Sequence, residues 1–144
     1  MTVKPIPDGY RTVTPYLVIE RAPELIGFMK DAFDAEETVR MDREDGLIAH
    51  AEVEIGDSKI MVADANAEFP PMPSLIHLYV EDCDKTFRRA VEAGATALNE
   101  PETQFYGDRS GGVRDASGNT WWITTHVEDV SAEEISKRAK QQES

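Results

Sequence analysis

The histidine and the two glutamates of the segment Ile48–Ile55 alternate with apolar residues, a spacing that is typical of a β-strand. In such a strand His50 and Glu52 project from one face, while the apolar set that begins with Ala49 projects from the other. The pKa of histidine crosses neutrality with small changes of environment, so His50 beside a carboxylate is a candidate general base. The sequence equally allows His50 only to hydrogen-bond to Glu52 or to a neighbouring strand.

Two further expected strands carry imidazole and aromatic side chains. His77 and Tyr79 project together from the strand Leu75–Val80, where they can bind a carbonyl or carboxylate group of a ligand. The alternative is that the ring of Tyr79 only closes a pocket. Trp121 and Trp122 are adjacent in a strand and therefore face opposite ways. We expect Trp121 in the core and Trp122 stacked on an apolar or planar ligand.

A glycine-rich stretch, Tyr106–Gly112, contains Arg109. Glycines allow the backbone to approach a ligand closely, and the planar guanidinium group binds carboxylates and phosphates. Arg109 can equally pair with Asp108 or Asp115 and hold the loop in place. His126 follows the last expected strand, and we expect a structural role for it.

The elements that position these residues occur twice along the chain. An amphipathic helix, Ala22–Phe33, follows the first expected strand, and a second helix, Asp84–Ala93, follows the fifth. A loop with three prolines after Phe69 separates the two halves. The expected strands are Thr12–Ile19, Glu37–Asp42, Ile48–Ile55, Ser58–Ala63, Leu75–Val80, Thr96–Asn99, Gly112–Asp115 and Thr120–Thr125. We expect one domain, 1–144, with modules at about 10–66 and 74–127 and a short helix in the tail 128–144.

Charge and composition restrict the class of partner. The 144 residues include 15 basic and 28 acidic side chains, and the formal net charge of −13 repels phosphate backbones and anionic lipid headgroups. We therefore expect neither nucleic acid nor a membrane as partner, and no apolar run approaches the roughly 20 residues that span a bilayer. Cys83 is the single cysteine of the sequence, which excludes an intramolecular disulfide. Since the first residues carry no apolar leader-like run, we expect a cytoplasmic protein.

The repeated order and the local sequence resemble the vicinal oxygen chelate (glyoxalase/bleomycin resistance/dioxygenase) superfamily, and within it the PhnB-like branch. The matching stretches cover nearly the whole chain in order: Pro7–Tyr10, Thr14–Leu17, Phe28–Glu37, His50–Glu52, Ile55–Ser58, Leu78–Asp82, Tyr106–Gly111, Arg114–Asp115 and Thr125–Asp129. The resemblance implies an α+β fold in which two βαβββ modules form a curved, cup-like mixed sheet with helices on its convex face. It also implies a homodimer, for which exposed module edges give a physical reason.

The resemblance further implies a ligand site on the concave face, and strand alternation assigns side chains to that face. The residues that we expect to bind the ligand are Tyr16, His50, Glu52, His77, Tyr79, Arg109 and Trp122.

Metal-dependent members of the superfamily hold a divalent ion with histidines and glutamates at the start of each module's first strand and on its last strand. Those positions fall here on Thr14, Leu75, Trp122 and either Ile60 or Met61. Only the threonine can ligate a metal, and weakly, so we expect neither the usual metal site nor another cofactor. A displaced divalent-metal site of His50, His77 and Glu52 is the alternative, since these side chains share the concave face.

Three functions remain open on this basis. The first is a metal-free binding protein for a small, partly apolar molecule, in the manner of the bleomycin-resistance branch. Its apolar walls would be Trp122, Tyr79 and Tyr16, and its polar anchors His50, Glu52, His77 and Arg109. The second is an enzyme, a metal-dependent lyase, isomerase or dioxygenase, in which His50, Glu52 or His77 is catalytic. The third is a dimerising surface whose cup is filled by Trp122 and Met61.

Overall fold

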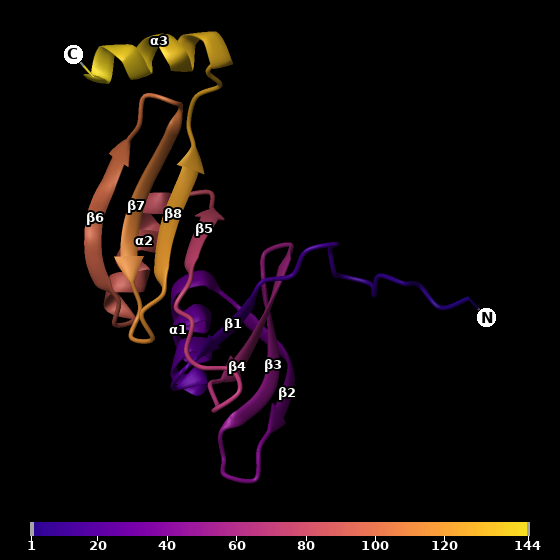
Figure 1. The fold of residues 1–144 in the computed structure, drawn as a ribbon. Helices are drawn as coiled ribbons and strands as arrows, with labels where there is room; N and C mark the ends of the chain where they lie inside the picture. Colours follow the sequence, from indigo (N-terminus) through magenta and orange to yellow (C-terminus); the bar gives the residue numbers. More distant parts are fainter. Residues whose placement is uncertain (1, 144) are drawn as a thin grey trace.

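The computed structural model describes residues 2–143 and contains two four-stranded mixed sheets and three helices (Figure 1). Sheet A has the strand order β1-β4-β3-β2, and sheet B has the order β5-β8-β7-β6. The strands of sheet A are β1 (Tyr16–Ile19), β2 (Glu36–Asp42), β3 (Ile48–Ile55) and β4 (Ser58–Asp64). The strands of sheet B are β5 (Leu75–Tyr79), β6 (Thr96–Thr103), β7 (Asp108–Arg114) and β8 (Thr120–His126). The helices are α1 (Ala22–Phe33), α2 (Cys83–Glu92) and α3 (Ala132–Glu143).

The two βαβββ modules lie with their helices on one side. In Figure 1, α1 and α2 lie behind the sheets, and we call the opposite face of each sheet, turned toward the viewer, the cup face. The predicted α+β fold is confirmed, but the cup is more open than expected. Within residues 2–143 no strand pair joins sheet A to sheet B, so one chain does not form a single continuous sheet.

Equivalent contacts show that the second module repeats the first. In both modules the first strand pairs in parallel with the last, and the other pairs are antiparallel. In both, a side chain on the last strand accepts a hydrogen bond from the first residue of the helix. Asp64 accepts from the backbone N–H of Ala22 at 2.9 Å, and Thr125 accepts from that of Cys83 at 2.9 Å. The internal repeat seen in the sequence is therefore a repeat of structure.

A shared core joins the two modules through α1. Trp121 of β8 is completely buried, and its ring lies 6.4 Å from that of Phe28 and 4.9 Å from that of Phe33. The indole N–H of Trp121 donates to a carboxylate oxygen of Asp115 at 2.7 Å. The helix of the first module thus packs on a side chain from the sheet of the second.

Three strand boundaries differ by four residues from those expected, namely the start of β1, the end of β6 and the start of β7. β6 runs to Thr103 rather than ending at Asn99. β1 begins only after Pro15, which has no N–H to donate to a neighbouring strand. β7 begins at Asp108 rather than at Gly112, so most of the glycine-rich stretch is strand rather than loop. His126, expected beyond the last strand, is the final residue of β8.

The C-terminal helix is tied to one end of sheet B. The hydroxyl of Ser131 accepts a hydrogen bond from the N–H of Glu134 at 3.1 Å and so caps the N-terminus of the tail helix that the sequence predicts. Arg138 of α3 donates to the carbonyl oxygen of Phe105 and to the carboxylate of Glu128, both at 2.9 Å. No helix in the described part of the chain is long and apolar enough to cross a membrane.

Candidate functional site

Tyr16, His50 and Glu52 come together on the cup face of sheet A. Strand β4 lies between β1 and β3, and the long side chain of Tyr16 reaches past it to His50. The hydroxyl oxygen of Tyr16 lies 2.8 Å from Nδ1 of His50, and Nε2 of His50 lies 2.7 Å from Oε2 of Glu52. We call these three residues the polar chain.

The polar chain can hold or move a proton. Burial raises the pKa of Tyr16, which keeps its hydroxyl protonated at neutral pH. When Nε2 of His50 carries the ring proton and donates to Glu52, Nδ1 is free to accept the hydrogen bond of Tyr16. Glu52 is 8% exposed, and its Oε1 has no hydrogen-bond partner among residues 2–143. The Tyr16 oxygen can therefore accept a hydrogen bond from a bound molecule, or take its proton while passing the hydroxyl proton to His50.

A pocket of about 570 Å³ opens beside Tyr16. The loop between β4 and β5 folds back over the cup face to cover it, because the N–H of Met72 donates to the carbonyl oxygen of Val18 at 2.8 Å. The lining is mostly apolar and includes Val18, Ala63, Phe69 and Met72. The proline-rich loop that separates the modules is thus also a wall of this pocket.

The pocket depends on an irregularity in β3. Alternation predicts Ala49 on the helix side, but Ala49 is exposed and lines the pocket, whereas Ile48 is completely buried in the core. The pairing with β2 shifts at this point, since Met41 is opposite His50 while Asp42 is opposite Ile48. Ala49 is the extra residue of a β-bulge. The prediction for Ala49 was wrong because an inserted residue reverses the alternation of side chains.

The structure places His77, Tyr79 and Trp122 together on the cup face of sheet B. The ring centroids of His77 and Tyr79 are 5.1 Å apart. The indole of Trp122 lies over Gly112, where an added Cβ would be 3.0 Å from the ring, so the close approach needs a glycine. Tyr79 is 65% exposed. This surface is therefore open in the single chain.

The side chains at the usual metal positions do not fit a divalent ion. Leu75 and Trp122 stand at two of these positions, and neither offers a lone pair that binds a metal. Within residues 2–143 no three histidine, cysteine, aspartate or glutamate side chains are grouped so that they could hold an ion. The displaced site is therefore not assembled in the described chain, because His77 lies outside the group formed by His50 and Glu52.

Arg109 lies on the helix side of sheet B, away from the other candidate residues. Its Nε and Nη2 donate to the two carboxylate oxygens of Asp84 on α2, at 2.9 and 3.0 Å. These hydrogen bonds lower the pKa of Asp84 and raise that of Arg109. Alternation along β7 explains the position, since Gly112 faces the cup and Arg109 is an odd number of residues away. Arg109 therefore has a structural contact, but its partner is Asp84 rather than the expected Asp108 or Asp115, and it holds α2 on the sheet rather than a loop.

A second polar network surrounds His126, to which the sequence assigned only a structural role. Its Nδ1 lies 2.8 Å from an oxygen of Asp108, and its Nε2 lies 2.8 Å from an oxygen of Asp129. The hydroxyl of Tyr79 donates to the other carboxylate oxygen of Asp108 at 2.8 Å. The hydrogen bonds to Asp108 and then to Asp129 raise the pKa of His126. Because Asp108 and His126 are directly opposite on β7 and β8, a correct strand register would have revealed the pair.

We expect the pKa of His126, measured by NMR titration, to lie above 6.5 and to fall toward 6.5 in Asp108→Asn. The variant removes the acceptor that most favours the charged ring. Since folding raises this pKa, the stabilisation by His126 is fully present below the unfolded-state pKa and is lost as the pH rises through the folded-state pKa. Asp129→Asn should lower the pKa less, because Asp129 is fully exposed. A pKa that Asp108→Asn leaves unchanged would contradict the network.

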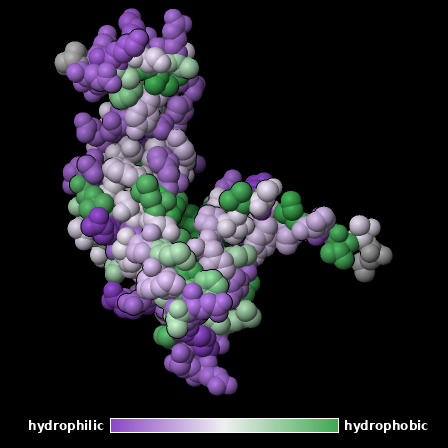
Figure 2. All heavy atoms as spheres, in the orientation of Figure 1, coloured by the Kyte–Doolittle hydropathy of each residue, from purple (hydrophilic) through white to green (hydrophobic). Residues whose placement is uncertain are grey.

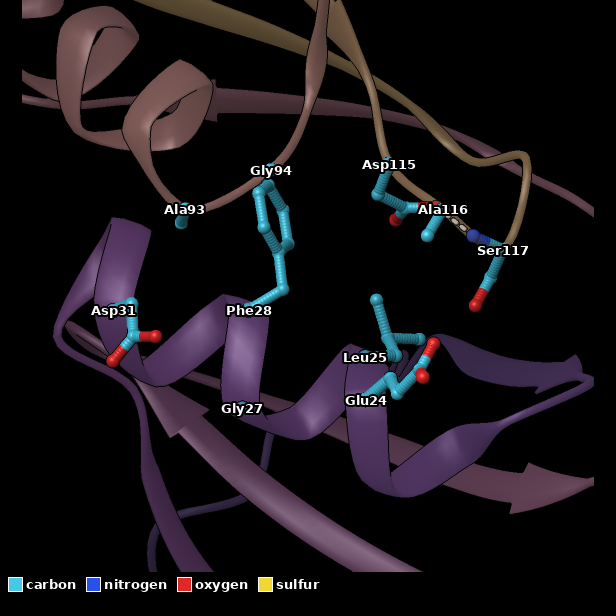
Figure 3. Close-up of a pocket in the computed structure, with 10 residues that line it drawn as sticks. All are labelled: Glu24, Leu25, Gly27, Phe28, Asp31, Ala93, Gly94, Asp115, Ala116 and Ser117. Carbon is cyan, nitrogen blue, oxygen red and sulfur yellow. Dashed lines mark hydrogen bonds between the residues drawn. The ribbon is translucent and has the colours of Figure 1, made fainter.

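A smaller cavity, of about 300 Å³, lies on the helix side between α1 and the β7–β8 turn (Figure 3). Leu25 and Phe28 point toward it from α1. Asp115 of the turn is already occupied, because its oxygens accept hydrogen bonds from Trp121 and Asn119. This cavity therefore offers little chemistry beside that of the polar chain.

Comparison with known proteins identifies the family. The model of the Glyoxalase/Bleomycin resistance protein/Dioxygenase superfamily matches residues 12–123. The chain belongs to this superfamily. The membership predicted from the sequence is thereby confirmed, and it agrees with the two βαβββ modules described above.

Relatives and solved structures of the superfamily resemble the chain over most of its length. An uncharacterized protein of Mycobacterium bovis is 36% identical over 137 residues, which cover 85% of this chain and 88% of the relative. TioX from Micromonospora sp. ML1 has a similar structure, with a TM-score of 0.69, 22% identity and coverage of 81% of this chain and 99% of its own. A structure described as a putative 3-demethylubiquinone-9 3-methyltransferase, PhnB protein, from Bacillus cereus has a TM-score of 0.61, 20% identity and coverage of 80% and 99%. At these identities the structures show the fold alone.

Proposed function

We propose that this superfamily member binds a small, partly apolar molecule in the pocket on the cup face of sheet A. The observation that carries the proposal is an apolar pocket of about 570 Å³ that is lined in part by Tyr16, whose hydroxyl lies 2.8 Å from Nδ1 of His50. Apolar walls with a few fixed polar groups are typical of small-molecule sites. The polar chain would orient the molecule, and Phe69 and Met72 would cover it. Binding of this kind requires no metal ion.

We propose further that the protein is a homodimer in which a second copy covers the cup face of sheet B. Leu75 and Tyr79 of that face are 69% and 65% exposed, and Figure 2 shows hydrophobic residues gathered where the two sheets meet. The outer edge of β5 also carries no strand partner within residues 2–143, whereas the outer edge of β1 is partly covered by the loop that carries Met72. Exposed apolar side chains and unpaired strand edges favour association. The second copy would bring His77, Tyr79 and Trp122 into a closed cup.

Filling the pocket is expected to weaken binding. Ala49→Phe places a ring in the pocket, and we expect it to weaken the binding of Nile red, a neutral apolar dye, by about 10-fold or more in a fluorescence titration. Ala97→Phe is the matched control, since Ala97 is an exposed alanine of β6 outside this pocket. It should leave the affinity unchanged. Equal affinities for the wild type and Ala49→Phe, or no binding by the wild type, would overturn the proposed site.

A further inference from the structure

We propose that the ligand of this pocket carries a carboxylate, which Arg43 binds. The proposal rests on the proposed function and names the chemical class of its ligand, a small apolar molecule with one anionic group. The sequence alone assigned no role to Arg43. In the structure Arg43 is one of the residues that line the pocket, together with Tyr16.

The guanidinium group of Arg43 has unused hydrogen-bonding capacity. The side chain is 23% exposed, and its Nε lies 3.3 Å from an oxygen of Asp45, which is itself 59% exposed. Neither terminal amino group of the guanidinium has a hydrogen-bond partner among residues 2–143. The chain carries 28 acidic side chains against 15 basic ones, yet in the described part of the chain Asp45 pairs only with the Nε of Arg43 and leaves the two terminal amino groups of its guanidinium unpaired. A ligand carboxylate would fill it with charge-assisted hydrogen bonds.

The backbone holds Arg43 in place at the start of the β2–β3 turn. Its N–H donates to the carbonyl oxygen of Leu47 at 2.6 Å, and its own carbonyl accepts from the N–H of Gly46 at 3.0 Å. A side chain that starts from a fixed backbone loses less conformational entropy when it binds a ligand. Arg43 is therefore partly organised for binding before the ligand arrives.

The other charged group of the pocket is already compensated. Asp64 is 4% exposed, and its two oxygens accept the backbone N–H groups of Ala22 and Ile48 at 2.9 and 2.7 Å. Ala22 is the first residue of α1, and the partial positive charge of a helix N-terminus offsets a carboxylate. Arg43 is thus the charged pocket residue that can still bind an ion.

The arrangement of the lining defines the rest of the ligand. Phe69, Met72 and Val18 surround the space with apolar surface, and Tyr16 also lines it, so that its hydroxyl would supply one further polar contact. A compound that fits has an aromatic or branched apolar body, a carboxylate for Arg43, and a hydroxyl or carbonyl group for Tyr16. An arylcarboxylate such as 1-naphthoate contains the two main features.

The test compares two compounds that differ in charge and share an aromatic body. We would displace bound Nile red with 1-naphthoate and with 1-naphthalenemethanol, a neutral alcohol of nearly the same shape. In the wild type 1-naphthoate should bind more tightly. Arg43→Gln should weaken the binding of 1-naphthoate by about 10- to 100-fold, since a hydrogen bond to a charged group is lost. It should leave the binding of the alcohol unchanged. Arg43→Lys, which keeps the charge without the planar fork, should retain part of the preference.

Arg40→Gln is the matched control for net charge, because Arg40 lies on β2 and pairs with Glu37 and Asp42 outside the pocket. It should change neither affinity. If both compounds bind equally well and Arg43→Gln changes nothing, the carboxylate proposal fails while the pocket stands. An equal loss of affinity for both compounds in Arg43→Gln would likewise overturn the carboxylate proposal, since the variant would then act on the shape of the pocket. Nile red binding that Ala49→Phe leaves intact would overturn the proposed function itself.

Discussion

Replacing Trp121 with alanine is expected to lower the free energy of unfolding by about 3–5 kcal/mol. The ring is completely buried and packs against Phe28 and Phe33 of α1. Truncation would leave a cavity between the two modules and would deprive the buried carboxylate of Asp115 of the indole N–H that it accepts at 2.7 Å. Urea unfolding followed by far-UV circular dichroism measures the loss as a lower midpoint.

The neighbouring tryptophan provides a matched control. Trp122 points to the cup face, where it is only partly buried over Gly112, so Trp122→Ala should cost about 1 kcal/mol. The same chemical change at adjacent positions thus has very different expected effects, because the strand sends the two rings to opposite faces. Equal losses in the two variants would contradict this assignment of faces.

Leu75→Arg is expected to convert the proposed homodimer to a monomer. Leu75 is 69% exposed on the cup face of sheet B, and a charge buried there without a partner would oppose association. A central interface residue of this kind contributes about 2 kcal/mol or more, which corresponds to an affinity at least about 30-fold weaker. Size-exclusion chromatography with light scattering at about 50 µM protein would show the molecular mass fall from that of two chains to that of one.

Val127→Arg is the control for the same added charge. Val127 is 51% exposed but follows β8 rather than lying on the cup face, so this variant should remain a dimer. A wild-type protein that is monomeric at this concentration would overturn the homodimer. A dimer that persists in Leu75→Arg would place the interface on another surface.

Local signals in the sequence predicted most of the regular structure. The helix Ala22–Phe33 and the strand Ile48–Ile55 have the bounds expected from the spacing of their apolar residues. These signals depend on residues that are close together in the sequence, so the bounds that they predict agree with the structure. Arg109 shows the limit of such local signals. Alternation assigns a side chain to a face only when the residue is known to lie in a strand, and the sequence did not predict that β7 begins at Asp108.

The candidate site depended more strongly on contacts between distant residues. Alternation indicated the cup face for His50 and Glu52, and the structure adds the hydrogen bond that joins them at 2.7 Å. The bulge at Ala49 was hidden from the sequence, because only the pairing of β3 with β2 creates it. The same holds for Arg43, whose place in the pocket depends on the β2–β3 turn and on the loop that carries Met72.

By itself the sequence determined the superfamily, the repeated βαβββ modules and the absence of plausible ligands at the usual metal positions, since these follow from residue types and their order. Only the tertiary structure decided that Tyr16 meets His50, that Arg109 binds Asp84 on α2, and that the two sheets remain separate in one chain. Each of these joins segments far apart in the sequence. Their distances are set by strand register, bulges and the packing of α1 and α2, which no local pattern specifies.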